Sequence, residues 1–365
     1  MATIEKRHTG SGDRYDVRYR DPSGRLRRKT FRRLAEARTF ERQTEADVMR
    51  GDWTDPRSGK VTFGEWWERW WPTIVNLRPS SRARDESYAR NHLLPRFGAV
   101  QLASIDHTMV ATWVADLTRS GRAPATVVKA AQILGKALDG AVDASMIRSN
   151  PAERVKLPRI ERHEMRFLDP GQVADLADAI DPRYEALVLV GAYCGLRLGE
   201  LSGLRRERVD LLHRRIEVCE IATEVNGHHH IGPPKTNAGH RTIPVPRPVA
   251  DVLGHQLGRT EGPLAFPAPS GGYIRPSLFR RRFWAPATSA VGLSGLRIHD
   301  LRHTAVALWI AAGASPNAVA ARAGHASVVT VLDRYGHLLP GDTRADDALD
   351  AMASSVPFRG ALRKA

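Results

Sequence analysis

The sequence has little cysteine and no long apolar run. Cys194 and Cys219 are the two cysteines among 365 residues, too few for a disulfide framework, and their spacing fits no zinc site. Neither a stretch of 18 apolar residues nor an N-terminal signal-peptide segment is present. We therefore expect a soluble, intracellular protein that does not enter a membrane.

Sequence patterns for nucleotide and metal binding are also missing. The chain has no glycine-rich P-loop and no carboxylate cluster suited to magnesium, which argues against ATP-driven and metal-assisted reactions. His228, His229 and His230 are consecutive, but side chains of a strand alternate between its faces, so three adjacent imidazoles cannot converge on one ion. We expect no metal and no cofactor.

Acidic residues are outnumbered by basic ones. The chain has 55 Lys and Arg against 40 Asp and Glu, a net charge of +15. This surplus suggests a polyanionic partner such as nucleic acid, although a generally basic proteome would give the same balance. With 42% hydrophobic residues, the chain can form two or three domains with cores of their own.

The first segment, residues 1–57, is small and very basic. Apolar and charged residues alternate over 15–20, a turn sequence follows at 21–24, and a second strand is expected at 25–31 before a helix over 34–49. A basic ribbon of this kind can enter a DNA groove, although its charges could also be only the solvated face of a small sheet. The candidate DNA contacts here are Arg18, Arg20, Arg27, Arg28 and Lys29.

Residues 61–158 have helical periodicity throughout. Thr62 is a suitable cap for the first helix, and longer helices are expected over 109–119 and 125–145. The aromatic cluster near the start is better explained as core than as a base-stacking surface; it consists of Trp66, Trp67, Trp70 and Trp71. Plausible contacts to DNA phosphates, which would position the protein without reading sequence, are Arg82, Arg84 and Lys129.

In the remaining segment, 166–365, an arginine lies between glycines after an apolar helix, and a lysine lies in a polar loop. An apolar helix over 184–194 ends at Gly195, and Arg197 follows between glycines with Glu200 three residues later. The planar, permanently charged fork of an arginine binds two phosphate oxygens together.

Farther along the same segment, Lys235 lies in a polar loop with the pattern Pro-Lys-Thr-x-x-x-x-Arg-x-Ile-Pro. A basic helix over 275–284 adds Arg280 and Arg281 as candidate phosphate contacts. A lysine in a polar loop or an arginine beside a helix cap is usually structural when it stands alone.

Residues 295–337 hold a further set of polar groups. His299 and Arg302 are three residues apart in a helical pattern and so share a face, with Leu301, Ala305, Leu308 and Ala312 expected to bury the other side. Two glycine breaks then allow His325 and Tyr335 to fold back toward the same pocket. Arg and His donors could stabilise both a tyrosine nucleophile and the charge that its attack on a phosphodiester creates, without a metal.

The ordered set His-x-x-Arg, Gly-His and Tyr ten residues later closely resembles the signature of the tyrosine recombinases, the phage-integrase family. The resemblance implies six catalytic residues, with Glu200 as the acidic group that orients the arginines: Arg197, Lys235, His299, Arg302, His325 and Tyr335. It also implies a multidomain, mainly α fold with small β-sheets. We expect an arm-type DNA-binding domain over 1–57, a helical SAM-like core-binding domain over 61–158, and an α+β catalytic domain over 166–365.

The implied function is site-specific integration, and excision, of phage or mobile-element DNA through a 3′-phosphotyrosyl intermediate. A homotetramer would act on two attachment-type sites of double-stranded DNA and pass through a Holliday junction, in the cytoplasm and nucleoid of a bacterial host. The helical tail over 342–354 would pack on a neighbouring protomer or be a frayed terminus. The resemblance leaves open whether a host DNA-bending protein and an excisionase take part.

Three other functions are compatible with parts of the pattern. A type IB topoisomerase-like enzyme would use the same tyrosine chemistry as a monomer, and a transposon or chromosome-resolution recombinase would be another member of the family. Chromosome-resolution members usually lack the basic N-terminal domain. A DNA-binding protein without chemistry is disfavoured because all six motif positions hold the expected residue type.

Overall fold

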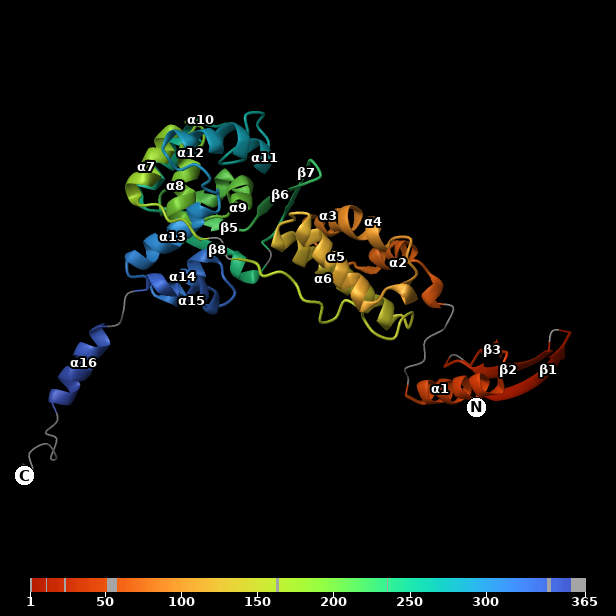
Figure 1. Ribbon diagram of the computed structural model, residues 1–365. Helices are drawn as coiled ribbons and strands as arrows, with labels where there is room; N and C mark the ends of the chain where they lie inside the picture. The colour runs from red at the N-terminus through yellow and green to blue at the C-terminus, as the bar shows by residue number, and fades with distance from the viewer. Residues whose placement is uncertain are drawn as a thin grey trace, which may run out of the picture. The chain divides into compact units, whose positions relative to one another are not determined.

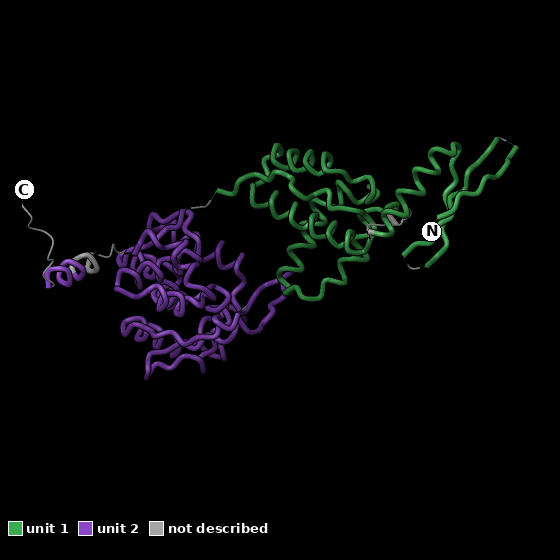
Figure 2. The backbone as a smooth tube through the Cα atoms, turned by 90° about the horizontal axis from the view of Figure 1, so that it is seen from below, with its two compact units in different colours: residues 1–162 green, residues 163–365 purple. Residues whose placement is uncertain are grey.

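The computed structural model describes residues 2–10, 12–22, 24–50, 58–161, 164–234, 236–339 and 343–355. The chain divides into two compact units, residues 1–162 and 163–365 (Figure 2). Helices predominate and the sheets are small and antiparallel (Figure 1), which confirms the expected fold class. None of the helices in these described ranges is long and apolar enough to cross a membrane.

The chain begins with a three-stranded sheet and one helix. Their bounds are β1 (Thr3–Thr9), β2 (Gly12–Arg20), β3 (Leu26–Phe31) and α1 (Leu34–Arg50), with β2 in the centre of the sheet. Val17 and Tyr19 of β2 are buried, and Tyr19 packs edge-on against Phe40 of α1 at 5.8 Å. Strand β1 was not predicted because nearly all its side chains are exposed, so it shows no apolar alternation.

The rest of the first unit is helical. Its elements are η1 (Ser58–Lys60), α2 (Phe63–Trp70), η2 (Trp71–Thr73), α3 (Pro79–Tyr88), the π-helix η3 (Ala89–Leu93), α4 (Leu94–Phe97), η4 (Leu102–Ser104), α5 (His107–Arg119) and α6 (Pro124–Asp143). Thr62 caps α2 through a reciprocal pair of hydrogen bonds with Glu65, as its position predicts. Trp66, Trp67 and Trp71 are less than a tenth exposed, and Trp70 is half-buried against them, so the aromatic cluster belongs to the core, as predicted.

The second unit packs short helices around two small sheets. Its helices up to residue 290 are α7 (Pro170–Ala179), α8 (Glu185–Cys194), α9 (Leu198–Gly203), η5 (Arg206–Arg208), η6 (Asn237–Gly239), α10 (Arg247–Arg259), α11 (Pro276–Phe279), the π-helix η7 (Arg280–Trp284) and α12 (Ala285–Ala290). The strands are β4 (Val209–Asp210), β5 (Arg215–Val218), β6 (Ile221–Val225), β7 (His228–Gly232) and β8 (Arg241–Pro244). The last helices are α13 (Asp300–Ala311), α14 (Pro316–Ala323), α15 (Val329–Tyr335), η8 (Gly336–Leu338) and α16 (Thr343–Ser354).

Two strands that are nearly consecutive in the sequence, β5 and β6, belong to different sheets. β5 pairs with β4 and β8, whereas β6 forms a separate hairpin with β7. Helix α9 holds β6 in place, because a Cβ on Gly203 would come within 2.9 Å of the backbone nitrogen of Ala222. In β7 the His229 side chain is half-buried and its two histidine neighbours are exposed, as the alternation of a strand requires. Among the described residues, no group of three acidic, His or Cys side chains could hold a metal ion.

Helix α13 is buried on more sides than its sequence pattern predicts. Leu301 and Ala305 are buried as expected, but Leu308 is only half-buried and Ala312 is exposed. The polar side is buried too, because α8 packs on one side of α13 (Figure 1) and α14 packs on another, where Val319 joins Trp309 in one cluster. This helix carries polar residues into the interior of the second unit, and the candidate site is built on it.

Candidate active site

A buried carboxylate organises the first part of the site. Glu200, in α9, is 2% exposed and accepts hydrogen bonds from Arg197 Nη1 at 2.6 Å and from Arg241 Nη2 at 2.9 Å. Burial alone would raise the pKa of Glu200, but the hydrogen bonds and charges of Arg241 and Arg197 outweigh it and hold this pKa below its ordinary value. Glu200 is therefore ionised and holds two guanidinium groups.

Arg197 and Arg241 differ in exposure and therefore in what they can contact. The Arg197 side chain is 39% exposed, whereas that of Arg241 is 6% exposed. The Nε of Arg241 also donates to the carbonyl of Arg322 at 2.7 Å, near the end of α14. Arg197 can reach an external ligand, and Arg241 links β8, α9 and α14 inside the protein.

Arg302 is fixed by main-chain carbonyls. Its side chain, 3% exposed, donates to the carbonyl of Gly195 at 2.7 Å and to that of Ala323. Gly195 has φ +69°, and a Cβ there would lie 2.8 Å from the ring of Trp309, so the turn that presents this carbonyl requires glycine. Burial, with the positive charge of Arg197, lowers the pKa of Arg302 to about 9, so this arginine stays charged at neutral pH.

His325 completes this part of the site. Arg302 Nη2 lies 3.2 Å from His325 Nε2, and because an arginine can only donate, Nε2 is the acceptor and Nδ1 carries the proton. Within the described ranges Nδ1 is buried without a hydrogen-bond partner. Burial and the charge of Arg302 lower the pKa of His325 to about 4, so the ring is neutral at pH 7 and has one unused donor.

The other histidines connect the pocket to the tyrosine. His299 is accessible to solvent, and its ring packs edge-on against His303 with centroids 4.9 Å apart. Partial burial, followed by the charges of His303 and Arg302, lowers the pKa of His299 to about 4. His303 Nδ1 lies 2.6 Å from the hydroxyl of Tyr335. The hydroxyl of Tyr335 thus contacts a histidine that the sequence pattern did not single out.

Tyr335 itself is withdrawn from solvent. It is 2% exposed and packs in a cluster with Val306, Trp309 and Val331. Burial raises the pKa of Tyr335, although Arg302 and Arg334 partly oppose this. In this arrangement the phenol is protonated and enclosed.

The structure brings together five of the six residues expected to be catalytic and supports them with two others. Lys235 lies outside the described residues. Sequence reasoning missed the parts played by Arg241 and His303. His303 is four residues after His299, a spacing that places both on one helix face and could have pointed to it. Nothing in the sequence connects Arg241 to Glu200.

The candidate DNA contacts of the N-terminal sheet divide between its two faces. In the pairing register Arg18 is opposite Arg28, and Arg20 is two residues from Arg18, so these three share the face away from α1. Arg27 and Lys29 lie on the α1 side. Ion pairs already link Arg18 to Glu5, Arg27 to Asp21 and Arg28 to Asp16.

In the helical part of the first unit the candidate contacts have internal partners as well. Arg84 and Lys129 both lie near the buried carboxylate of Asp85, at 3.0 and 3.5 Å. The guanidinium of Arg82 stacks over Trp71 at 4.9 Å. These arginines and the lysine contribute to the packing of the bundle whether or not they also contact phosphates.

Arg280 and Arg281, in η7, are exposed in the second unit. Arg280 lines a cavity of about 780 Å³ that also includes Leu198 and His299. One candidate phosphate contact therefore lies in the same depression as a candidate catalytic histidine.

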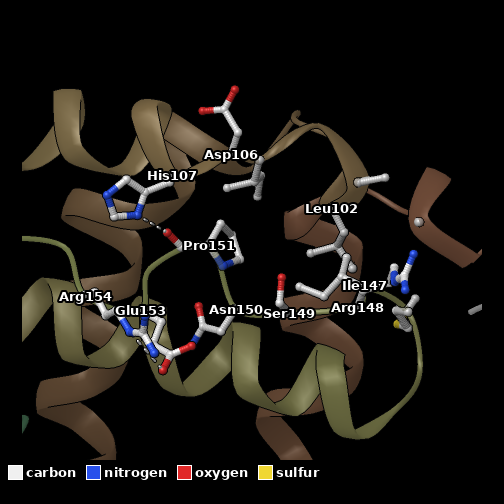
Figure 3. A pocket seen from close by; sticks show the side chains of 14 residues that line it. Leu102, Asp106, His107, Ile147, Arg148, Ser149, Asn150, Pro151, Glu153 and Arg154 are labelled. Atoms are coloured by element: carbon white, nitrogen blue, oxygen red, sulfur yellow. Dashed lines mark hydrogen bonds and ion pairs between the residues drawn. The ribbon is translucent and has the colours of Figure 1, made fainter. Parts of the chain in front are cut away.

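The first unit has a cavity of about 660 Å³, and Figure 3 shows the side chains that line it. His107 Nδ1 lies 3.2 Å from the carbonyl of Pro151 at its edge, and Arg154 pairs with Glu153 at 3.8 Å. Arg148 and Asp106 also line it, so the walls hold two arginines and two acidic residues. This cavity lacks the surplus of positive charge seen around Arg302.

Comparisons with known proteins identify the class. Residues 166–341 match the phage integrase family, and residues 62–118 match the phage integrase N-terminal SAM-like domain. The chain is 28% identical over 350 residues to a protein of Mycobacterium tuberculosis (strain H37Rv) described as a prophage phiRv2 integrase, with 92% of each chain covered.

Two solved structures share the fold. The Tn1549 transposon integrase, in complex with a circular intermediate DNA, matches with a TM-score of 0.69 at 19% identity, over 80% of this chain and 99% of that chain. A lambda integrase tetramer bound to a Holliday junction matches with a TM-score of 0.56 at 15% identity, over 88% and 92%.

The chain belongs to the phage integrase family of tyrosine recombinases and is a site-specific DNA recombinase of the integrase kind. This confirms the resemblance seen in the sequence, and the topoisomerase-like alternative is not favoured.

We predict that Arg241→Ala destabilises the second unit by about 3–5 kcal/mol, because it leaves the buried Glu200 carboxylate with one exposed partner. Hydrogen exchange of the α9 and α14 amides during a urea titration would measure this unit separately from the first. The matched control is Arg208→Ala, which removes an exposed ion pair to Glu217 and should leave the stability nearly unchanged. Equal losses of stability for the two substitutions would contradict the role of Arg241 in linking β8, α9 and α14.

We also predict that the second unit loses stability as the pH falls from about 6.5 toward 4. His299 and His325 have folded-state pKa values of about 4, below the ordinary 6.5, so the unfolded chain binds more protons in this window and acid favours unfolding. Urea midpoints at pH 7 and pH 5 would measure the loss. His325→Gln should reduce it, whereas substitution of the exposed His228 by Gln should not.

Proposed function

We propose that Arg197, Arg302, His299 and His325 bind the scissile phosphodiester of duplex DNA and that Tyr335 attacks it. One observation carries this proposal. Arg197 and Arg241 both donate hydrogen bonds to the carboxylate of Glu200, and Arg302 interacts electrostatically with the same carboxylate. In the described part of the chain Arg302 has carbonyl and imidazole partners but no carboxylate. A pocket with this surplus of positive charge favours an anionic ligand.

The arginines are placed to stabilise charge without first rearranging. Carbonyl acceptors hold Arg302 and Glu200 holds Arg197, so both forks keep their orientation before a ligand arrives. Donors fixed in a partly dry pocket stabilise the charge that develops in a pentacoordinate transition state more than mobile donors in water do. The accessible ring of His299 would donate to a remaining phosphate oxygen, and the unused Nδ1–H of His325, which is buried in the DNA-free protein, would do so once DNA binding uncovers it.

The reaction follows from these positions. The hydroxyl oxygen of Tyr335 forms a bond to phosphorus, the bond from phosphorus to the 5′-oxygen breaks, and the tyrosine proton passes to His299. The products are a 3′-phosphotyrosyl link and a 5′-hydroxyl, whose proton comes from Lys235. The link keeps the energy of the phosphodiester, so attack by a 5′-hydroxyl from another strand can rejoin the DNA.

The assembly proposed for this chain follows the lambda integrase tetramer bound to a Holliday junction. Four protomers would act on two attachment-type sites, with residues 1–57 as an arm-type DNA-binding domain, 61–158 as the core-binding domain and 166–365 as the catalytic domain. Helix α16, with Leu349 and Met352 exposed, would dock on a neighbouring protomer. Candidate further partners in the host cytoplasm and nucleoid are a DNA-bending protein and an excisionase.

Covalent capture tests the nucleophile directly. The protein is incubated with fragments of its source element and of host DNA, denatured in SDS, and the linked DNA ends are sequenced. We expect adducts at one or two unique sites, and none with Tyr335→Phe, which lacks the hydroxyl but should bind DNA normally. An adduct that persists in this variant would place the nucleophile elsewhere. Adducts scattered over all DNA would support topoisomerase-like activity.

Removal of residues 1–57 tests the role proposed for the N-terminal domain. The shortened protein should cleave a core site at the normal rate but integrate poorly, because the arm contacts would be lost while the catalytic pocket is unchanged. Integration in an assay with two attachment sites, compared with suicide-substrate cleavage of one site, separates the two effects. Integration at the full rate would show that this domain is not an arm-binding domain.

A further inference from the structure

The hydroxyl of Tyr335 is enclosed and already has a partner. It lies 2.6 Å from His303 Nδ1, and the two residues are 2% and 5% exposed. In this position both the ring and its hydroxyl are enclosed by protein. If Tyr335 is the nucleophile, as proposed above, its hydroxyl must leave His303 before it can attack.

We propose that His303 is a positioning residue that holds Tyr335 in a resting position, so that cleavage begins when this hydrogen bond breaks. The inference rests on the proposed role of Tyr335 as the nucleophile.

The chemistry of the pair suits restraint rather than activation. Burial is the main cause that lowers the pKa of His303 and raises that of Tyr335, so both groups are neutral at pH 7. In the tautomer with its proton on Nε2, His303 accepts a hydrogen bond at Nδ1 from the Tyr335 hydroxyl, and the phenol retains its proton. A tyrosine held in this way is not ionised and is hydrogen-bonded to a histidine inside the protein.

The helix that carries Tyr335 packs against the rest of the protein on one side only. In α15 (Val329–Tyr335) Val331 and Tyr335 are buried, whereas Val329 and Leu332 are 54% and 46% exposed. A short helix with a single buried face can move at a smaller cost than one that is packed all around. The hydrogen bond to His303 and the packing of the Tyr335 ring are therefore a large part of what keeps the nucleophile inside.

The restraint also lies next to the proposed phosphate site. The ring of His303 packs against that of His299 at 4.9 Å, and His299 is accessible to solvent in the cavity of about 780 Å³. A phosphate bound by His299 would thus be separated from the Tyr335 hydroxyl by one side chain, that of His303. DNA binding and release of the nucleophile can be coupled through these two rings.

The test compares rates of adduct formation on a suicide duplex that carries the site found by covalent capture. His303→Leu removes the acceptor, and we expect single-turnover adduct formation at saturating DNA to become about three- to tenfold faster, the range that corresponds to one hydrogen bond of ordinary strength. His303→Asn places an amide oxygen near the position of Nδ1 and should return the rate toward that of the unmodified protein. A slower or unchanged rate with folded His303→Leu would overturn the proposal, and a slower one would indicate that His303 accepts the proton during attack.

A second measurement keeps the proposal testable if His303→Leu folds poorly. With 3-fluorotyrosine at position 335, the fluorine resonance of the DNA-free protein should indicate a buried ring and should shift when the suicide duplex binds. A resonance that stays at its DNA-free position in the duplex-bound protein, before adduct has formed, would overturn the proposal. Tyr335→Phe, run in parallel, tests the nucleophile itself, so failure of the proposed function would be seen separately as an adduct that persists in that variant.

Discussion

The site depends on one buried ion pair, that between Glu200 and Arg241. Its two members come from α9 and β8, and Arg241 extends the link to the carbonyl of Arg322 at the end of α14. Arg197 precedes α9, and His325 follows α14. A single side chain therefore fixes the relative positions of segments more than a hundred residues apart in the sequence, and the candidate phosphate ligands lie at the ends of those segments.

Such a pair costs desolvation energy, and replacement by apolar residues is often tolerated in proteins where only stability matters. Here the arrangement does something an apolar core could not. Glu200 neutralises one charge of three, so Arg241 can be buried and Arg197 oriented, while Arg302 keeps its full charge on carbonyl acceptors. The remaining positive charge is left for a ligand, which makes the pocket specific for an anion before any ligand is bound.

Much of this could be predicted from the sequence, and the reasons differ among elements. The caps at Thr62, Asp169 and Ser315 are local hydrogen bonds, and a local pattern suffices to place them. The left-handed glycine after α8 is a local feature too. By contrast β1 has no apolar face, and the chain from β5 to β6 divides between two sheets because of what packs against each strand. Neither property is visible in a window of ten residues.

The same distinction applies to the site. The spacing of His299 and Arg302 reports a shared helix face, so their proximity was predictable. The partner of Glu200 was not, because Arg241 reaches it only through tertiary packing. The burial of Tyr335 was also not predictable, because an amphipathic pattern indicates which side of a helix is apolar and not whether its last residue is enclosed.

The enclosure of Tyr335 is consistent with the energetics proposed for the reaction. A phosphotyrosyl link preserves the energy of the bond it replaces, so cleavage and rejoining are nearly balanced and no ATP hydrolysis gives them a direction. The timing of cleavage must then be set by the moment at which the nucleophile becomes available. The anion-binding groups of the pocket are fixed in advance, whereas the tyrosine hydroxyl is bonded to His303 in the interior. Binding of the phosphate and release of the nucleophile can therefore be separate events. With the proposed roles, the arginines could bind DNA in the positions they already hold while Tyr335, the proposed nucleophile, is still inside the fold.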